Sequence, residues 1–391
     1  MINFQEMTVN EFLTEYWQKK FLVIRNALPD FVNPINADEL AGLALEEEIE
    51  SRLVLQQPGK NLSWNLKRGP FEERDFQKLP ASHWTLLVQG VDRFVPEVAD
   101  LLGYFHFLPQ WRFDDVMISY AVTDGGVGPH YDHYDVFLFQ AQGRRKWQLS
   151  TKNCRLDNYQ EGLDLRIMKQ FDIEQEIILE PGDMLYLPPH VAHNGIALSD
   201  DCMTYSFGYR SYEGQELWDS FGEHLAGNAN QIWYRDPDWS GIKSSAELPQ
   251  TAWLQAKNAL QQLLDDEENL KKWFGCFATS IDRHAESILP MPLEADEIIP
   301  IEEFRTGLLQ AEEVIKSAVC RFAFIPEGSQ MKLFINGCEW DNNNITTGLV
   351  RLVAEHNTIA PVELKPYLGN DADLEFLYEL WKLQWLEIVE K

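Results

Sequence analysis

Short apolar runs, separated by glycine and proline, follow one another through the first 210 residues of the chain. Runs of this length between turn residues are typical of strands in a β-sandwich or barrel. The clearest runs cover residues 115–122, 135–141, 144–150, 174–180, 183–188 and 202–210. The tripeptide "AQG" at 141–143 lies between two of them and predicts a hairpin turn. The pattern therefore predicts a mostly β domain.

From about residue 213 the apolar residues recur at helical instead of strand spacing. Leu217, Phe221 and Leu225 share one face of a predicted helix, and a second helical pattern covers residues 253–274. The segment 289–300 is rich in proline and acidic residues, which is typical of a linker. The sequence therefore predicts a β domain at 1–212, a helical region at 213–290 and a further domain at 291–391.

The last hundred residues mix helical patterns with one hairpin signal. Asn336-Gly337 lies between two apolar runs and predicts a tight type I′ turn. A terminal helical stripe is more typical of core or interface packing than of a ligand site. Its members are Leu374, Leu377, Tyr378, Trp381, Trp385 and Ile388.

Composition limits the possible partners and the compartment. The net charge of −29 would repel phosphate backbones, so unaided nucleic-acid binding is not expected, and it would attract basic proteins. The chain has five scattered cysteines and no CxxC pair, which argues against a disulfide framework and a cysteine zinc site. It shows neither a signal-peptide pattern nor an apolar run of about 20 residues. We therefore expect a cytoplasmic protein without a membrane segment.

The stretch "GGVGPHYDHYDVFLFQ" at 125–140 contains His-x-Asp twice in overlapping register. Side chains two residues apart on a strand share a face, so His130 with Asp132, or His133 with Asp135, could supply two ligands to one metal ion. The glycines and Pro129 before the first pair favour a sharp turn that would leave these ligands at an open strand end. The motif alone is short and does not decide between the pairs.

A third ligand is available in "EPGDMLYLPPHVAHN" at 180–194, which ends a predicted strand and a Pro-Pro turn with His193. Two histidines and one carboxylate with open coordination positions form the facial triad of non-haem Fe(II) oxygenases. The competing interpretation is that these residues are hydrogen-bonded histidines in an ordinary β protein. Spacing favours the metal site only slightly.

The sequence resembles Jumonji-C (cupin-4) oxygenases, specifically the bacterial ribosomal oxygenases. The motifs that carry this resemblance are "GGVGPHYDHYDVFLFQAQGRRKWQL", "EPGDMLYLPPHVAHNGIAL" and "YSFGYR". Further similarity lies in "EFLTEYWQKKFLVIRNAL", "RGPFEERDF", "WTLLVQGVDRFVPEVADLL", "WRFDDVMISY" and "WFGCFATSIDRHAE". The resemblance extends over nearly the whole chain and is weakest in the last hundred residues. It implies a double-stranded β-helix, or cupin jelly roll, for the catalytic domain.

The resemblance also decides between the overlapping pairs. In the family the ligating pair directly follows Gly-Pro, which implies that His130 and Asp132 are ligands and that His133 and Asp135 point to the opposite face. His193, and not His190, matches the distal ligand. Arg145 matches the residue that anchors the far carboxylate of 2-oxoglutarate, and Ser119 matches its hydroxyl partner. The implied cofactor is Fe(II), with 2-oxoglutarate and O₂ as cosubstrates and succinate and CO₂ as products.

The family further implies hydroxylation of an arginine β-carbon in the large-subunit ribosomal protein numbered sixteen. The acidic composition independently favours a basic protein substrate. Asp124, Tyr131 and Tyr134 are candidates for holding its guanidinium, without a choice among them. The middle helices would form a homodimer interface and the tail a winged-helix-like domain. Because the tail is itself acidic, we expect no direct DNA binding.

Three alternatives remain at the level of sequence. The chain could be a cupin-fold binding protein without catalysis, a Jumonji-C hydroxylase acting on another basic protein, or a small-molecule oxygenase on the same fold. The first of these would produce no succinate from 2-oxoglutarate with added Fe(II). The helical and C-terminal extensions fit a macromolecular substrate better than a small molecule, by analogy only.

Overall fold

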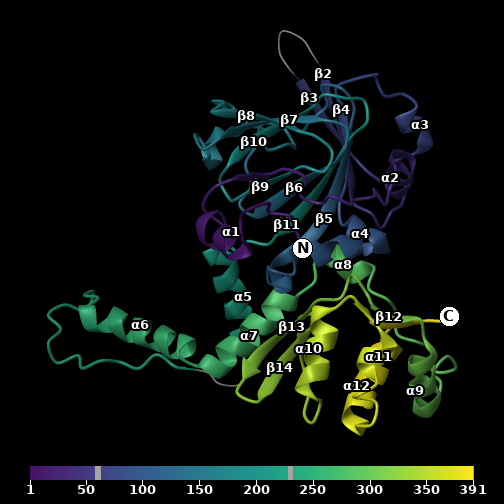
Figure 1. The fold of residues 1–391 in the computed structure, drawn as a ribbon. Coiled ribbons are helices and arrows are strands. Elements are labelled where there is room, and N and C mark those ends of the chain that lie inside the picture. Colours follow the sequence, from purple (N-terminus) through teal and green to yellow (C-terminus); the bar gives the residue numbers. More distant parts are fainter. Residues whose placement is uncertain (58–62, 228–231, 391) are drawn as a thin grey trace. The chain divides into compact units, whose positions relative to one another are not determined.

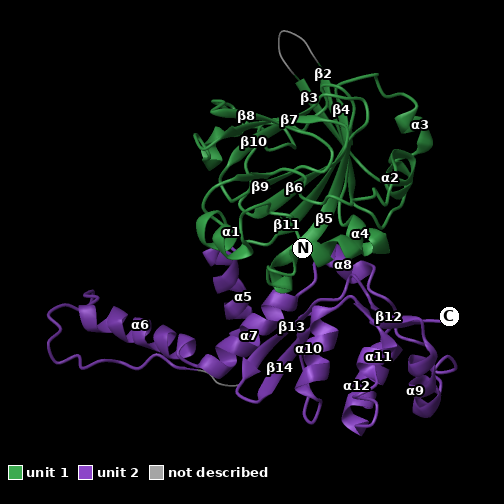
Figure 2. Cartoon of the chain, viewed as in Figure 1, with its two compact units in different colours: residues 1–211 green, residues 212–391 purple. Residues whose placement is uncertain are grey.

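The computed structural model describes residues 1–57, 63–227 and 232–390. They form two compact units, Met1–Ser211 and Tyr212–Lys391 (Figure 2). The first predicted boundary, at residue 212, lies beside the division between these units. The further separation of a helical region and a C-terminal domain near residue 290 stays a prediction.

Unit 1 is built around two antiparallel sheets (Figure 1). The larger sheet has the strand order β1-β9-β6-β11-β5-β4-β2-β3, and the smaller has the order β10-β7-β8. The strands are β1 (Leu22–Ile24), β2 (Ser51–Gln57), β3 (Ser63–Arg68), β4 (Trp84–Val88), β5 (Phe113–Ala121), β6 (Asp135–Gln142), β7 (Arg145–Ser150), β8 (Gln175–Leu179), β9 (Met184–Leu187), β10 (Ala192–Ala197) and β11 (Cys202–Tyr209). All six runs predicted as strands are therefore strands, and the predicted jelly-roll architecture is confirmed. The predicted hairpin at 141–143 is wrong, because this turn leads from β6 in the larger sheet to β7 in the smaller one.

The two faces of the larger sheet bury different partners, because side chains alternate along each strand. From β6, Val136 and Leu138 pack against Trp147 and Leu149 of the smaller sheet. Phe137 lies in the other core, which the N-terminal helical segments cover. These segments are α1 (Val9–Glu15), α2 (Ala37–Leu43), α3 (Glu73–Phe76), α4 (Pro96–Asp100) and two short 3₁₀ turns at 91–93 and 101–105. Two further 3₁₀ turns lie at 110–112 and 156–158. The space between the two sheets is thus the interior of the jelly roll.

Unit 2 combines helices with two three-stranded sheets, β16-β12-β17 and β13-β14-β15. Its helices are α5 (Gly214–Ala226), α6 (Gln250–Leu264), α7 (Glu267–Thr279), α8 (Arg283–Ser287), α9 (Ile301–Gln310), α10 (Thr347–Glu355), α11 (Pro361–Leu364) and α12 (Asp371–Lys382). Its strands are β12 (Glu313–Lys316), β13 (Phe322–Glu327), β14 (Gln330–Ile335), β15 (Cys338–Trp340), β16 (Thr358–Ile359) and β17 (Leu386–Val389). Helix α6 has no buried residue and extends away from the rest of the unit in Figure 1.

Local sequence signals explain several features of unit 2. Asn336 and Gly337 join β14 to β15 with φ angles of 48° and 81°, as the predicted type I′ turn requires. The helical pattern at 253–274 forms two helices instead of one. The first ends at its C-cap Asp265, and Asp266 caps the second, since its carboxylate accepts a hydrogen bond from the backbone N–H of Asn269.

The terminal apolar stripe at residues 374–388 is used for packing, as predicted, but it does not form one continuous helix. Leu374 and Leu377 are buried on α12, which ends at Lys382, and Ile388 lies on β17. Both elements pack against the same core, so one apolar pattern serves a helix and a strand. Within the described residues, no helix combines the length and the apolar character needed to cross a membrane.

Candidate metal centre

The glycine-rich segment before β6 allows two chain segments to approach closely. A Cβ on Gly126 would lie 2.4 Å from the carbonyl oxygen of Gly195 in β10, and Gly128 has a φ angle of +84°. Next to this contact His130 and His193 form an isolated antiparallel bridge. The N–H of His130 donates to the His193 carbonyl at 3.0 Å, and the N–H of His193 donates to the His130 carbonyl at 2.8 Å. Two imidazoles 63 residues apart in sequence are thereby fixed side by side.

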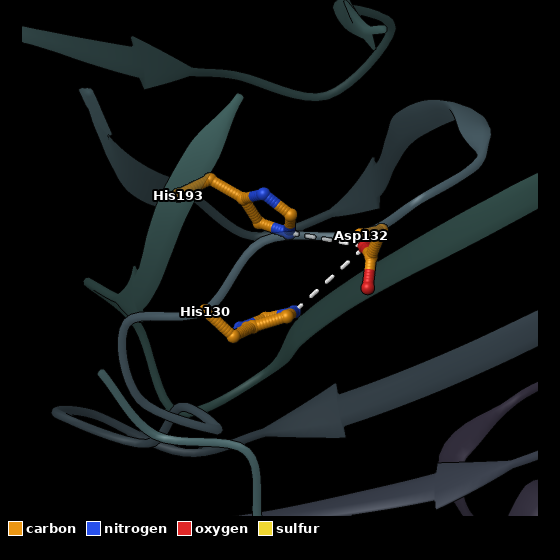
Figure 3. Close-up of side chains that lie close together, drawn as sticks. All are labelled: His130, Asp132 and His193. Carbon is orange, nitrogen blue, oxygen red and sulfur yellow. Dashed lines mark ion pairs between the residues drawn. The ribbon is translucent and has the colours of Figure 1, made fainter. Parts of the chain in front are cut away.

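The side chains of His130, Asp132 and His193 converge (Figure 3). Oδ2 of Asp132 lies 4.0 Å from Nε2 of His130 and 3.7 Å from Nε2 of His193. One possible ligand atom from each residue lies within 4.8 Å of the other two. An ion bound about 2.1 Å from each ligand atom fits between atoms separated by up to about 4.2 Å. The three side chains that the resemblance implied as ligands are therefore brought together.

The remaining ring nitrogens fix the tautomer of both histidines. Nδ1 of His130 lies 2.9 Å from the carbonyl oxygen of Gly128, and Nδ1 of His193 lies 3.0 Å from that of Val191. A carbonyl can only accept, so each Nδ1 carries the proton and each Nε2 presents a lone pair to a metal. Burial, followed by the neighbouring His130, lowers the pKa of His193 to about 4, which favours its neutral, ligating form.

The other candidate ligands, His133, Asp135 and His190, make contacts outside the His-Asp-His cluster. Asp135 is fully buried and accepts hydrogen bonds from Tyr186 at 2.6 Å and Gln18 at 3.1 Å. The His133 ring packs edge-on against that of His190, with centroids 4.9 Å apart. His190 is exposed, and its backbone N–H donates to the carbonyl of Asp132 at 2.9 Å. His190 therefore supports the metal-binding segment through its backbone, and its imidazole packs against His133.

Arg145 is the inward-facing member of its basic cluster. Its neighbours Arg144 and Lys146 point outward to Glu180 and Glu176, whereas Arg145 is 5% exposed. Nη1 of Arg145 donates to Oγ of Ser119 at 3.4 Å, and its Nη2 is buried without a hydrogen-bond partner among the described residues. A buried guanidinium with an unpaired NH₂ group at Nη2 and neutral hydrogen-bond partners is suited to an anionic ligand.

Trp147 connects this guanidinium with the histidines. It lies two residues after Arg145 on β7 and therefore shares its face. Its ring centroid is 5.7 Å from Cζ of Arg145 and 5.8 Å from the ring centroid of His193. The indole leaves no room for a side chain on the facing strand, since a Cβ on Gly195 would lie 2.7 Å from the ring. Arg145 and the His-Asp-His cluster thus belong to one interior space between the sheets.

The three candidate residues for holding the substrate guanidinium differ in their surroundings. Asp124 lies 3.9 Å from His83, and Tyr131 is buried against Met168 and Ala192. Tyr134 is 42% exposed as a residue. The charge of Asp132, followed by desolvation of the Tyr134 hydroxyl and by the charge of Asp115, raises the pKa of Tyr134 well above its usual value. Tyr134 therefore lies in the field of both carboxylates.

Sequence reasoning missed Asp115. It lies on β5 four residues before Ser119, where the register between β5 and β11 shifts. It is 6% exposed and accepts a hydrogen bond from Gln89 at 2.7 Å. Burial, followed by the charges of Asp92 and Asp114, raises its pKa to about 7. The sequence around Asp115 carries no distinctive pattern, so its burial was visible only in the structure.

The geometry agrees with comparisons to known proteins. Residues 100–217 match the JmjC domain. The chain is 39% identical to the ribosomal protein uL16 3-hydroxylase of Escherichia coli K12, over 75% of this chain and 78% of that protein. It is 34% identical to a probable ribosomal oxygenase of Haemophilus influenzae, over 87% of this chain and 84% of that protein.

Solved structures are similar to this protein over nearly the whole chain. The X-ray structure of E. coli YcfD superposes with a TM-score of 0.84 at 32% identity, covering 97% of this chain and 98% of YcfD. A second structure of YcfD, a ribosomal oxygenase, is a complex with cobalt and 2-oxoglutarate, and it matches with a TM-score of 0.82 at 31% identity over 98% of each chain. The chain belongs to the ribosomal oxygenases of the JmjC-domain family.

Proposed function

We propose that this protein is an Fe(II)- and 2-oxoglutarate-dependent oxygenase that hydroxylates an arginine β-carbon of ribosomal protein uL16. The observation that carries the proposal is the combination, in one interior space, of a His-Asp-His cluster with a buried arginine that has no carboxylate partner among the residues described. The similarity to the E. coli uL16 3-hydroxylase supports the substrate.

His130, Asp132 and His193 would hold the ferrous ion, since their donor set is that of non-haem Fe(II) oxygenases. When bound, this ion couples the oxidation of 2-oxoglutarate to succinate and CO₂ with insertion of one oxygen atom of O₂ into a substrate C–H bond. The protein supplies orientation and a shielded interior. The paired backbone hydrogen bonds between His130 and His193 keep the two imidazoles in place before any ligand binds.

Arg145 would bind the far carboxylate of 2-oxoglutarate, with Ser119 as the hydroxyl partner. Nη2 of Arg145 is available for this contact, and Oγ of Ser119 lies 3.4 Å from Nη1. Cobalt and 2-oxoglutarate bind together in YcfD, which supports the same pair of ligands here.

Asp115 and Tyr134 would receive the substrate arginine. A carboxyl group whose pKa is raised to about 7 by burial and by neighbouring acids gains most from a cation placed beside it. The partly exposed Tyr134 lies in the field of Asp115 and the metal ligand Asp132. The net charge of −29 would speed the encounter with a basic ribosomal protein.

The test is mass spectrometry of purified uL16 after incubation with the protein, Fe(II), 2-oxoglutarate and O₂. We expect a gain of one oxygen atom on a single arginine, which is absent with His130→Ala and retained with His133→Ala. Succinate formation only with other basic proteins would retain the chemistry and discard the substrate. If neither hydroxylation nor succinate forms, the chain is a non-catalytic cupin-fold binding protein.

We further expect a homodimer formed through residues 213–290, in the cytoplasm. Large apolar side chains are exposed on α5 and α6, with Trp218 at 49%, Trp253 at 56% and Leu260 at 46%. The double substitution Trp253→Asp and Leu260→Asp should yield monomers in sedimentation velocity. Leu156→Asp, at an exposed apolar residue of unit 1, is the matched control. Unchanged dimers with the double variant would exclude α6 from the interface.

The acidic segment 291–391 is not expected to bind DNA, because its charge repels phosphates. An electrophoretic mobility assay of the full chain with duplex DNA at low salt should show no complex. Salt-sensitive, tight binding would contradict this expectation.

A further inference from the structure

The orientation of the Arg145 guanidinium is set by two neutral contacts. Its Nε donates to Sγ of Cys202 at 3.3 Å, and its Nη1 donates to Oγ of Ser119 at 3.4 Å. A guanidinium is planar and its nitrogens are held at fixed angles. Contacts at two of these nitrogens therefore determine where the third, Nη2, points.

Cys202 is held firmly at this position. It is fully buried at the start of β11, where it packs against Ala121 and Ala197. Ala197 lies opposite Arg145 in the β10–β7 pair, and Ala121 lies opposite Cys202 in the β11–β5 pair. The small side chains from these three strands leave room for the arginine and place the sulfur against its Nε.

Gln140 holds the sulfur from the other side. The β6–β11 register shifts at this point, since Met203 pairs with Gln142 and Thr204 pairs with Gln140. This leaves Ala141 as the extra residue of a β-bulge, which redirects the strand. The fully buried amide of Gln140 donates to Sγ of Cys202 at 3.3 Å and to the Met203 carbonyl at 3.2 Å. Its oxygen accepts a hydrogen bond from the Thr204 hydroxyl at 3.2 Å.

The chemistry of the sulfur suits this task. A carboxylate beside Nε would form an ion pair with the guanidinium and compete with an incoming anion. A thiol is only a weak acceptor and carries no charge. It can therefore orient the Arg145 guanidinium while the positive charge of the guanidinium stays available to a ligand. Among the described residues, Arg145 has hydrogen bonds to the Cys202 thiol and the Ser119 hydroxyl and no carboxylate partner.

We propose that Cys202, held by Gln140, is a positioning residue that aims Nη2 of Arg145 at the far carboxylate of the cosubstrate. This inference rests on the proposed function, because it requires Arg145 to be the 2-oxoglutarate anchor. It assigns to the β6 bulge a role in cosubstrate selectivity, acting through the arginine.

The test compares ligand binding to the cobalt-loaded protein by calorimetry, without turnover. The ligands are 2-oxoglutarate and 2-oxopentanoate, which has the same chain length but lacks the far carboxylate. Cys202→Ala should raise the dissociation constant of 2-oxoglutarate about fivefold, as expected for loss of one hydrogen bond of ordinary strength, because the thiol is a weak acceptor. The dissociation constant of 2-oxopentanoate should change less than twofold, because this ligand does not reach Arg145.

Two further variants separate positioning from packing. Cys202→Ser retains an acceptor on a shorter side chain and should restore part of the affinity for 2-oxoglutarate. Cys320→Ala makes the same change at a buried cysteine of unit 2 and should leave both constants unchanged.

Equal weakening of both ligands by Cys202→Ala would indicate a packing role and overturn the inference, as would no change in either. If the unsubstituted protein binds cobalt but not 2-oxoglutarate, the proposed function itself is wrong and the inference is wrong with it. If it binds 2-oxoglutarate and Cys202→Ala binds it equally well, only the inference fails.

Discussion

Replacing Arg145 by methionine tests both the proposed cosubstrate anchor and the cost of burying a guanidinium without a counterion. Methionine retains most of the side-chain length and volume but removes the charge and every N–H group. We expect the substitution to weaken the binding of 2-oxoglutarate and to raise the free energy of unfolding of the ligand-free protein. Arg144→Met is the matched control, because the Arg144 side chain is 53% exposed and lies 3.6 Å from Glu180.

The magnitudes follow from the burial of Arg145, which is 5% exposed. Removing one partner of a buried charge pair costs about 3–5 kcal/mol, so the affinity for 2-oxoglutarate should fall at least about 100-fold. In the absence of ligand the same guanidinium is a buried charge whose hydrogen-bond partners in the described part of the chain, Cys202 and Ser119, are both neutral. Replacing buried charges by apolar groups of similar volume often stabilises proteins, so the free energy of unfolding should rise by about 1–2 kcal/mol.

Both quantities are measured on the same preparations. Calorimetry with cobalt-loaded protein gives the dissociation constant of 2-oxoglutarate, and urea denaturation of the ligand-free protein gives the free energy of unfolding. Arg144→Met should change the binding constant less than twofold and the stability by less than about 0.5 kcal/mol, as expected of an exposed ion pair.

The reasoning would be refuted if Arg145→Met left 2-oxoglutarate binding unchanged, since a group other than Arg145 would then anchor the far carboxylate. A loss of more than about 2 kcal/mol of stability would show that the guanidinium is a structural element of the interior. Equal effects of the substitutions at 144 and 145 would show that the basic cluster acts through its net charge.

Other predictions address the metal ligands, the buried acid and the glycine contact. His130→Ala should weaken cobalt binding at least about 100-fold, whereas His133→Ala should bind cobalt normally in the same titration. Burial raises the pKa of Asp115 from 3.8 to about 7, so its ionisation opposes folding increasingly as pH rises through this range. Asp115→Asn should therefore gain stability over the unsubstituted protein between pH 4 and 8, by up to about 4 kcal/mol, while losing affinity for uL16. A pH-independent stability difference would contradict the assignment. Gly126→Ala should lose more than about 2 kcal/mol of stability because its Cβ would lie 2.4 Å from a backbone oxygen. The control is Gly42→Ala on α2, where an added Cβ would meet no neighbouring atom within 4 Å. This variant should gain about 0.5–1 kcal/mol in the free energy of unfolding in the same urea titration.

Much of the fold could be predicted because the signals are local. The strand runs of unit 1 carry their own alternation and turn residues, and each became a strand within two residues of its expected bounds. Asn336-Gly337 encodes its turn in two residues, since both must adopt positive φ angles. The pattern at 253–274 misled because apolar periodicity continues across a break that one capping aspartate, Asp266, creates.

The site was predictable only in part. The residues alone left the two His-x-Asp pairs open, and the resemblance selected His130 with Asp132. In the structure Asp135 faces a different core, where Tyr186 and Gln18 donate hydrogen bonds to its carboxylate. Asp115 escaped notice because a single acid in a strand has no distinctive pattern. Its importance comes from burial and from the field of Asp92 and Asp114.

The sequence by itself determined the strand-rich first unit, the turn at Asn336-Gly337 and the presence of two overlapping candidate ligand pairs. These depend on residues that are neighbours in the chain, and neighbouring residues leave a pattern. The tertiary structure alone decided that Arg145 contacts Cys202 and Ser119 and has no carboxylate partner among the described residues. Those contacts join β7, β11 and β5, so they depend on how the strands close around a common interior and on a bulge that shifts one of them by a residue. Distances of this kind between remote residues arise only when the chain has packed.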